Sequence, residues 1–335
     1  MPQSVEKSSV FSAQRWLALI EALRIPHWVK NVFVLAALAF SGKWNAPDWE
    51  HAWLMTLGAF FVFCLLSSAV YLFNDVVDRH SDRVHPAKAS RPVASGRLPV
   101  SWALGAGVLL VAAAELLLAQ MSMRLYDINQ PFVGLGLLVY AGLYLLLHLG
   151  YNAGLRRRPI LDVLIVAMGF VLRAMGGAAA ISVRPSVWLV FCTFTLCLFI
   201  ALAKRRSEIV ALGETSRHTR VVNRFYSPTN LEHMLAVSAG LAIITYGLYC
   251  VDDRTIRHLG SANMIWTIPL VVYGMFRYYC LTLSTHQEDL TQAVYSDMVL
   301  WAVGLAWVVL VAMILVWGKQ DWLHLLESGP IYPAP

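Results

Sequence analysis

Charged residues are scarce in this sequence. Asp, Glu, Lys and Arg make up 14% of its 335 residues, whereas apolar residues make up 58%. A soluble domain carries about 25% charged residues, so this composition excludes an ordinary soluble protein and predicts an integral membrane protein. The formal net charge of +6 does not point to nucleic acid, because no soluble domain is available to bind it.

Cysteine patterns and processing signals are also missing. The five cysteines all lie in apolar segments, without the spacing of a metal site or a disulfide framework, so we interpret them as small core residues. The apolar run at 17–23 is interrupted by Glu21 and lacks a small-residue cleavage site, which argues against a cleaved signal peptide.

Nine apolar segments follow one another along the chain, most of them close to the ~20 residues that span a bilayer. We therefore predict an all-α integral membrane protein with nine transmembrane helices. The segments are 28–41, 52–73, 100–120, 132–150, 160–181, 186–203, 234–252, 264–283 and 297–317. The first segment is short, and we expect it to begin inside the amphipathic stretch that precedes it.

We expect three parts. Residues 1–27 would form an N-terminal segment with an interfacial amphipathic helix over 11–25, where Trp16 and Ile20 oppose Arg15 and Glu21. Residues 28–318 would form the catalytic transmembrane domain, and residues 319–335 a short tail whose last seven residues are expected to be disordered.

Basic residues gather in alternate loops. The loops after the second, fourth and sixth segments hold five, three and six Lys or Arg residues, whereas those after the first, third, fifth and seventh hold one, one, one and two. Because positive loops stay in the cytoplasm, we predict a cytoplasmic N-terminus and an external C-terminus in the plasma membrane.

An acidic motif follows the second apolar segment: Asn74-Asp75-Val76-Val77-Asp78-Arg79-His80-Ser81-Asp82. Asp75, Asp78 and Asp82 are three and four residues apart, so a helix presents all three carboxylates on one face. Like charges beside hydrocarbon need a cation, and oxygen ligands at a membrane boundary suit Mg²⁺. The alternative is a solvated helix end whose aspartates pair with Arg79 and Arg83.

Basic clusters occur at the same ends of other segments, namely 24–31, 91–97, 151–159 and 204–208, with Arg220, Arg224 and Tyr226 beyond. Singly, each basic residue fits a topology anchor whose charge reaches the interface. Together with the aspartates, they describe a site in which carboxylates recruit a metal and Lys and Arg neutralise phosphate oxygens.

The acidic motif, followed by Arg91-Pro92 and Gly96, resembles that of the UbiA superfamily of intramembrane transferases. The resemblance covers nearly the whole chain. It implies a nine-helix bundle with a lipid-open cavity and diphosphate chemistry at a cytoplasmic cap. Family prenyltransferases typically carry a second aspartate-rich motif after the sixth span, where this chain reads Lys204-Arg205-Arg206-Ser207-Glu208-Ile209.

This segment has no aspartate pair. In this respect the chain resembles the branch of the superfamily that transfers phosphoribose from phosphoribosyl pyrophosphate to decaprenyl phosphate. The resemblance implies Mg²⁺ held by Asp75, Asp78 and Asp82, with Asp75, Asp78, Lys30 and Lys204 as catalytic residues. It also implies a set of substrate-binding residues: Arg24, Asn31, Asn74, Arg91, Tyr151, Arg156, Arg173, Arg205, Glu208, Arg224 and Tyr226. The expected product is a lipid-linked precursor of arabinose for a cell-envelope glycan.

Charged residues inside the predicted spans face protein or a wet cavity. Glu115 and Arg173 can pair with one another, which we favour for Glu115, or Arg173 can reach the acceptor phosphate. Arg277 and Asp297 are open to the same two interpretations.

Two other functions compete with phosphoribosyl transfer. Prenyl transfer to an aromatic acceptor is disfavoured because the second aspartate motif is missing. A transporter of an anionic solute is disfavoured because it should show inverted repeats and broken helices near the bilayer midplane, whereas the charge here gathers at one face. The sequence leaves acceptor length and oligomeric state open, a homo-oligomer included.

Overall fold

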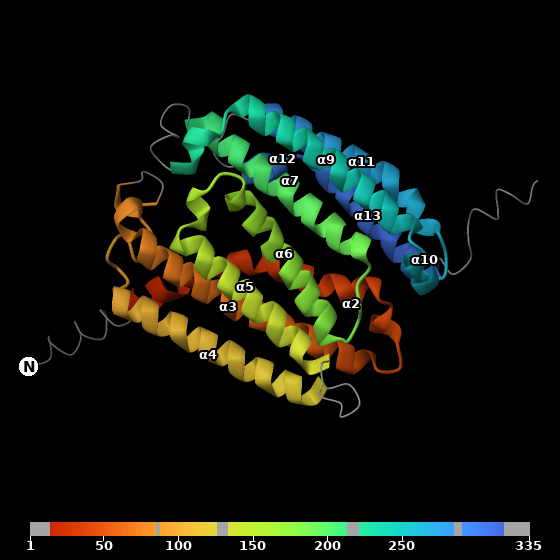
Figure 1. Ribbon diagram of the computed structural model, residues 1–335, viewed down its shortest axis with the longest axis horizontal. Helices are drawn as coiled ribbons and strands as arrows, with labels where there is room; N and C mark the ends of the chain where they lie inside the picture. Colours follow the sequence, from red (N-terminus) through yellow and green to blue (C-terminus); the bar gives the residue numbers. More distant parts are fainter. Residues whose placement is uncertain (1–13, 85–87, 126–132, 213–220, 285–289, 318–335) are drawn as a thin grey trace, which may run out of the picture. The chain divides into compact units, whose positions relative to one another are not determined.

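The computed structural model describes residues 14–84, 88–125, 133–212, 221–284 and 290–317, and every element in these ranges is a helix (Figure 1). Nine helices in the described chain are long and apolar enough to cross a membrane. The prediction of an all-α protein with nine spans is therefore confirmed. The first span begins at Gln14, within the amphipathic stretch, and continues to Phe40.

The chain divides into two compact units. The first unit contains residues 1–36, 50–156 and 172–183, and the second contains residues 37–49, 157–171 and 184–335. The helix α6 (Leu161–Ala180) contributes its first half to the second unit and its second half to the first.

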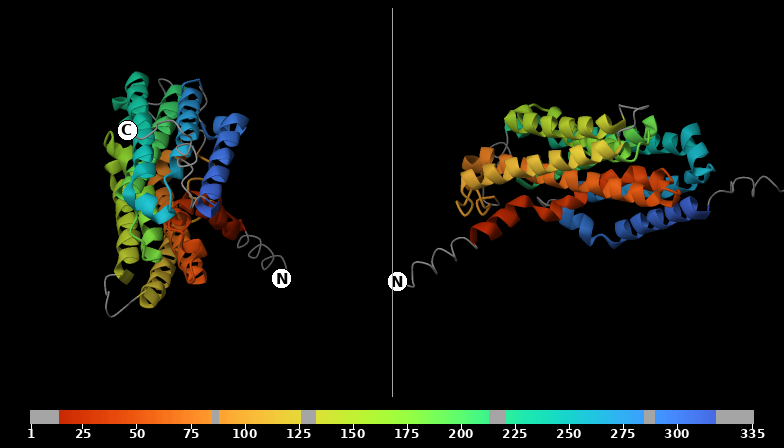
Figure 2. Two further views of the ribbon diagram at one scale, coloured as in Figure 1. Left: turned by 90° about the vertical axis from the view of Figure 1, so that its right-hand side faces the viewer. Right: turned by 90° about the horizontal axis from the view of Figure 1, so that it is seen from below.

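The first unit is built on a long helix, α3 (Trp49–Arg83), which carries the acidic motif in its last turns. Its apolar residues Leu72 and Val76 pack in one buried cluster with Leu98, just before α4 (Val100–Leu125), and with Ala103 in α4. The two helices run side by side (Figure 2). Gly107 on α4 lets them approach, since a Cβ atom there would lie 2.6 Å from the Phe73 ring. The helix continues ten residues beyond the predicted end of the second span, and the motif lies in this continuation.

The remaining elements of the first unit bring the other charged residues. A helix over 14–23 leads through Arg24 into the 3-10 helix η1 (Ile25–Leu35). Arg24 has a left-handed backbone (φ 53°), and Pro26 follows in the first turn of η1, which together end the preceding helix. The helix α5 (Val133–Ala153) and the short 3-10 helix η3 (Leu155–Arg157) complete this unit.

In the second unit, α7 (Val187–Leu212) lies along α9 (Pro228–Val251), which also packs against α11 (Ile268–Ser284) (Figure 1). A buried apolar cluster joins these helices through residues such as Phe199, Leu235 and Met275. The other elements of this unit are η2 (Lys43–Asn45), η5 (Val221–Phe225), α10 (Asp253–Leu259), η6 (Asn263–Thr267), α12 (Leu290–Ser296) and α13 (Met298–Trp317); α2 (Ala36–Phe40) joins the two units along the chain.

Two expectations for charged residues in the spans are settled. Arg277 and Asp297 pair with one another, with 2.7 Å between Nη2 and Oδ2. The Glu115–Arg173 pair is wrong: Glu115 is exposed on α4, while Arg173 is buried and donates to Asn31 and Tyr144. Polar side chains in the interior satisfy this guanidinium instead.

Candidate active site

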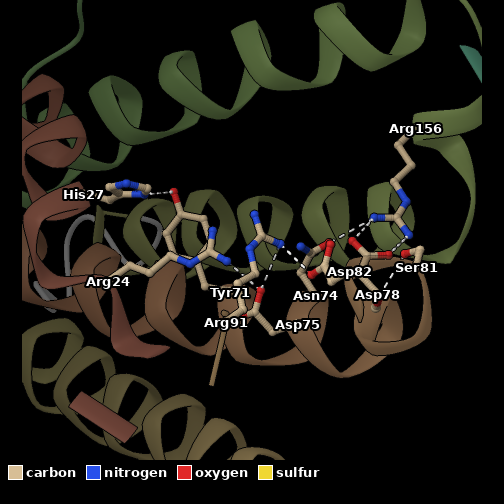
Figure 3. Close-up of polar contacts among 10 residues, drawn as sticks. All are labelled: Arg24, His27, Tyr71, Asn74, Asp75, Asp78, Ser81, Asp82, Arg91 and Arg156. Carbon is tan, nitrogen blue, oxygen red and sulfur yellow. Dashed lines mark hydrogen bonds and ion pairs between the residues drawn. The ribbon is translucent and has the colours of Figure 1, made fainter. Parts of the chain in front are cut away.

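The three aspartates of the motif lie on one face of the end of α3, as their spacing predicts (Figure 3). Asp75 is 1% exposed and Asp82 is also buried, whereas Asp78 is half-buried. Buried carboxylates need compensating charge, because burial penalises the ionised form. Their partners therefore define the electrostatics of this end of the first unit.

Three arginines from three separate segments meet these carboxylates (Figure 3). Arg24 Nη2 lies 2.6 Å from Asp75 Oδ1, and Arg91 Nη1 lies 2.7 Å from Asp82 Oδ2 and 3.5 Å from Asp75 Oδ1. Arg156 donates to both oxygens of Asp78, which raises the pKa of its guanidinium.

The pairing suggested for a solvated helix end is therefore wrong. Arg79 donates to the backbone carbonyl of Val76, and Arg83 donates to that of Ala94. The arginines that meet the aspartates come from 51, 9 and 78 residues away in the sequence. Two of the three arginines come from distant parts of the chain, which indicates a site assembled by the fold rather than a helix end.

The backbone around Arg24 is held by Ser68. This buried hydroxyl donates to the Leu23 carbonyl at 2.9 Å and accepts from Trp28 Nε1 at 3.0 Å, so it fixes the chain on both sides of Arg24. The guanidinium itself lies over the Tyr71 ring, 4.8 Å from its centroid. Cation–π contact and the ion pair together orient this cation.

Arg91 is presented by a loop that is anchored to the N-terminal helix. Arg97 makes a two-pronged contact with Glu21, at 2.7 and 2.9 Å, which raises the pKa of Arg97. Gly96 adopts φ 80°, a left-handed conformation that favours glycine, and the Leu98 amide closes the turn on the Pro92 carbonyl. The Arg-Pro…Gly pattern in the sequence thus marks a shaped loop.

Arg156 also donates to Asn74 Oδ1 at 3.1 Å, so Asn74 belongs to the same group (Figure 3). Tyr151 is half-buried near Arg156 and acts on it electrostatically. The structure therefore gathers eight of the predicted site residues in the first unit: Arg24, Asn74, Asp75, Asp78, Asp82, Arg91, Tyr151 and Arg156.

A second group of predicted residues lies elsewhere in the first unit. Asn31 is fully buried on η1; its amide donates toward Cys64 and Ser67 of α3, and its oxygen accepts from Arg173 Nε at 2.7 Å. Arg173 also donates to the Tyr144 hydroxyl at 2.8 Å. Lys30 is partly buried, within electrostatic reach of Arg24 and Arg173. Sequence reasoning missed Tyr144, because a tyrosine in an apolar segment carries no signal of its own.

In the second unit, Asp162 is the centre of a buried polar cluster that the sequence did not predict. Its oxygens accept from Arg205 Nη2 at 2.6 Å and from the Tyr226 hydroxyl at 2.7 Å. Tyr226 in turn accepts from the amide of Ile160, whose φ is 69°. Burial and the bond to Asp162 raise the pKa of Tyr226.

Arg205 is also paired with Glu208, at 2.9 Å. The structure thus brings three predicted residues, Arg205, Glu208 and Tyr226, into one network with Asp162. Lys204 and Arg224 are exposed. Arg220 and the C-terminal tail lie outside the described residues.

The motif suits a divalent cation by its chemistry. All its donors are oxygens, and Asp75 Oδ2 is buried without a hydrogen-bond partner. Within the described ranges, no three His, Cys, Asp or Glu side chains converge to hold an ion. Mg²⁺ is usually held by one or two carboxylates together with substrate phosphates, so this arrangement fits a cation shared with a ligand.

Comparison with known proteins gives an independent view. A sequence profile described as the UbiA prenyltransferase family matches residues 31–303. A Corynebacterium glutamicum protein named decaprenyl-phosphate phosphoribosyltransferase is 34% identical over 297 residues, which cover 88% of this chain and 86% of that protein. A Mycolicibacterium smegmatis protein of the same name is 30% identical over 298 residues, 87% of this chain and 90% of that protein.

The fold has counterparts among solved structures. A UbiA homologue from Archaeoglobus fulgidus, solved with GPP and Mg²⁺, superimposes with a TM-score of 0.62 at 16% identity, over 89% of this chain and 99% of that one. At this identity the likeness concerns the fold alone.

Proposed function

Because the chain belongs to the UbiA prenyltransferase family of membrane transferases, we propose that it transfers 5-phosphoribose from phosphoribosyl pyrophosphate to a polyprenyl phosphate and releases pyrophosphate. The observation that carries this proposal is the set of three arginines that pair with the three aspartates on one face of the end of α3. The names of the relatives that match along most of this chain support the choice of substrates.

The donor would bind at the acidic motif. Asp75 and Asp78, with Asp82 directly or through water, would hold Mg²⁺, which when bound supplies Lewis-acid neutralisation of the leaving pyrophosphate. Guanidinium groups match phosphate oxygens in two-pronged geometry, so Arg24, Arg91 and Arg156 are suited to the donor's phosphates. Asn74 and Tyr151 line the same group, and Lys30 would meet charge that builds on the leaving group.

The acceptor phosphate would be met by Arg173, which Asn31 and Tyr144 orient. Lys204, Arg205, Glu208, Arg224 and Tyr226 are proposed to serve the remaining phosphate groups, directly or by orienting one another. Arg205 already has carboxylate partners, so its contribution would combine with a structural role.

The reaction needs no proton transfer. The bond from the anomeric carbon to the pyrophosphate oxygen breaks as positive charge develops on the ribose ring. An oxygen of the polyprenyl phosphate, already ionised at neutral pH, attacks the opposite face and forms the β-linked lipid product. This accounts for a site composed of Asp, Arg and Lys, without a general base.

We place the protein in the plasma membrane, with its N-terminus and active site cytoplasmic and its C-terminus outside. The product would feed lipid-linked arabinose synthesis for a cell-envelope glycan. Cytoplasmic access matters because phosphoribosyl pyrophosphate is water-soluble and cannot cross the bilayer unaided.

The test uses purified protein with labelled phosphoribosyl pyrophosphate, Mg²⁺ and polyprenyl phosphate. We expect label to enter the lipid fraction, with equimolar release of pyrophosphate. A parallel reaction contains a prenyl diphosphate and an aromatic acid. Turnover in that reaction alone would replace phosphoribosyl transfer with prenyl transfer, and turnover in neither would reject both.

A further inference from the structure

The carboxylates of the acidic motif are bound by cations of the chain itself. Asp75, Asp78 and Asp82 carry three negative charges, and Arg24, Arg91 and Arg156 bring three positive charges to them. The three carboxylates and the three guanidinium groups that bind them therefore carry no net charge together. The balance depends on side chains from three separate segments, two of them more than 50 residues from their aspartates, which indicates that it is a property of the folded site.

A divalent cation would compete with these arginines for the same atoms. Asp75 Oδ1 accepts from Arg24, and Asp78 accepts from Arg156 through both oxygens. Asp75 Oδ2, buried and without a hydrogen-bond partner, is an oxygen that a cation can take without displacing a guanidinium. Bridging from there to Asp78 requires Arg156 to leave, because Arg156 occupies both oxygens of that carboxylate. Asp82 accepts from Arg91 through Oδ2, so a cation that takes both oxygens of Asp82 displaces Arg91.

Displacing an arginine by a free metal ion is unfavourable. The ion would add two positive charges to a balanced, largely desolvated group and leave a guanidinium without its anion. A diphosphate that arrives with the ion changes this. Its oxygens accept the displaced guanidinium in two-pronged geometry, and its charge offsets that of the metal.

We infer that Arg24, Arg91 and Arg156 exchange partners on binding, from the carboxylates to phosphate oxygens, so that the site takes up a divalent cation as its diphosphate complex. The inference rests on the proposed function for the identity of that diphosphate, the leaving group of the donor. Ser68 holds the Leu23 carbonyl before Arg24 and the Trp28 side chain after it, so the Arg24 side chain can change partner while this segment stays in place.

The first measurement needs no variant. Mn²⁺ binding to the detergent-purified full chain is followed by equilibrium dialysis, with and without inorganic pyrophosphate and corrected for the complex in solution. We expect pyrophosphate to tighten Mn²⁺ binding about tenfold or more, and Mn²⁺ to tighten pyrophosphate binding by the same factor, as linkage requires. Equal Mn²⁺ affinity in both conditions would overturn the inference.

Variants give a test in which two affinities move in opposite directions. In Arg24→Gln and Arg91→Gln, free Mn²⁺ should bind severalfold tighter because a competitor is lost, while pyrophosphate in the presence of Mn²⁺ should bind about tenfold weaker. Arg79→Gln is the matched control, since Arg79 lies on α3 beside the aspartates but donates to a backbone carbonyl rather than to a carboxylate. It should change neither affinity.

A parallel loss of both affinities in Arg24→Gln and Arg91→Gln would mean that these arginines only support the fold, which would reject the exchange. If the variants do not fold, the wild-type comparison decides by itself. Neither phosphoribosyl pyrophosphate nor a lipid phosphate is used, so these results are independent of the test of the proposed function. An enzyme that used a prenyl diphosphate could still pass.

Discussion

Single side chains at the end of α3 decide what this site can bind. Asp75 combines 1% exposure with two arginine neighbours and a carboxylate oxygen that lacks a hydrogen-bond partner. An arrangement with such an oxygen is costly unless a ligand uses it. The residue-scale predictions concern this carboxylate and the basic residues of α7.

Asp75→Asn and Asp78→Asn should each lower turnover by at least about 100-fold, or roughly 2.7 kcal/mol of transition-state stabilisation. Each removes a charged group that we propose as a ligand of Mg²⁺, so any residual activity should need more Mg²⁺. Initial rates across a Mg²⁺ titration provide the measurement. Glu50→Gln, at the exposed opposite end of the same helix, is the control. Near-normal rates at low Mg²⁺ in both Asp variants would show that the motif holds no catalytic metal.

Arg205 and Lys204 are adjacent in sequence but differ in surroundings. Arg205→Ala leaves buried Asp162 without its cation, and breaking a buried pair typically costs about 3–5 kcal/mol. The apparent Tm of the Arg205→Ala variant in detergent should therefore fall by several degrees. Exposed Lys204→Ala should keep the Tm and instead weaken use of a phosphate substrate by roughly ten- to a hundredfold.

A different outcome would separate the two roles of Arg205. If Arg205→Ala keeps the wild-type Tm and weakens phosphate use, then it acts chiefly as a substrate ligand, as its place in the sequence suggests. Wild-type kinetics in Lys204→Ala would mean that Lys204 binds no substrate phosphate and serves only as a topology anchor.

At the scale of elements, the close approach of η1 to α6 determines how Asn31 and Arg173 meet in the first unit. Gly177 on α6 faces the backbone of η1, where an added Cβ atom would lie 1.9 Å from the Val34 carbonyl oxygen. Asn31 lies one turn before Val34, and Arg173 one turn before Gly177. Close backbone contact therefore places the Asn31–Arg173 hydrogen bond.

Gly177→Ala should displace η1, break the Asn31–Arg173 contact, and lower both the apparent Tm and the use of the lipid acceptor. A backbone clash cannot be relieved by a rotamer change, so we expect a loss of about 2–3 kcal/mol or more. Gly142→Ala on α5 is the control, because nothing lies within 4 Å of its added Cβ atom and alanine favours the helix. Similar Tm values for the two variants would contradict this packing.

At the scale of the whole molecule, the prediction concerns its orientation in the membrane. The described residues contain nine candidate spans. The proposed sidedness rests on five basic residues in the loop after the second predicted span against one in the loop after the first. In a variant without the native cysteines, Ser90→Cys should react with an impermeant reagent only from the cytoplasm. Asp48→Cys should react only from the outside. Both residues are exposed.

Labelling with the reverse sidedness would invert the topology and separate the site from its water-soluble donor. Labelling of both positions from one side would contradict a single crossing by α3. Permeabilised cells, in which both positions should react, provide the control for accessibility.

The sequence by itself determined the class of protein, the number of spans and the face of α3 that carries the aspartates. These follow from local quantities: the length of apolar runs and the 3.6-residue period of a helix. The acidic motif was found in the same way, since its aspartates are three and four residues apart within a single short segment.

Only the tertiary structure decided which charges meet. The sequence offered Arg79 and Arg83 as alternative partners of the aspartates, and Glu115 as a partner of Arg173, because nearness along the chain or equal depth in the membrane was the available guide. The actual partners, such as Arg24 for Asp75 and Asn31 for Arg173, come from 51 and 142 residues away. Ion pairs and buried hydrogen bonds depend on distances of a few ångströms between segments, and packing of the helices sets those distances.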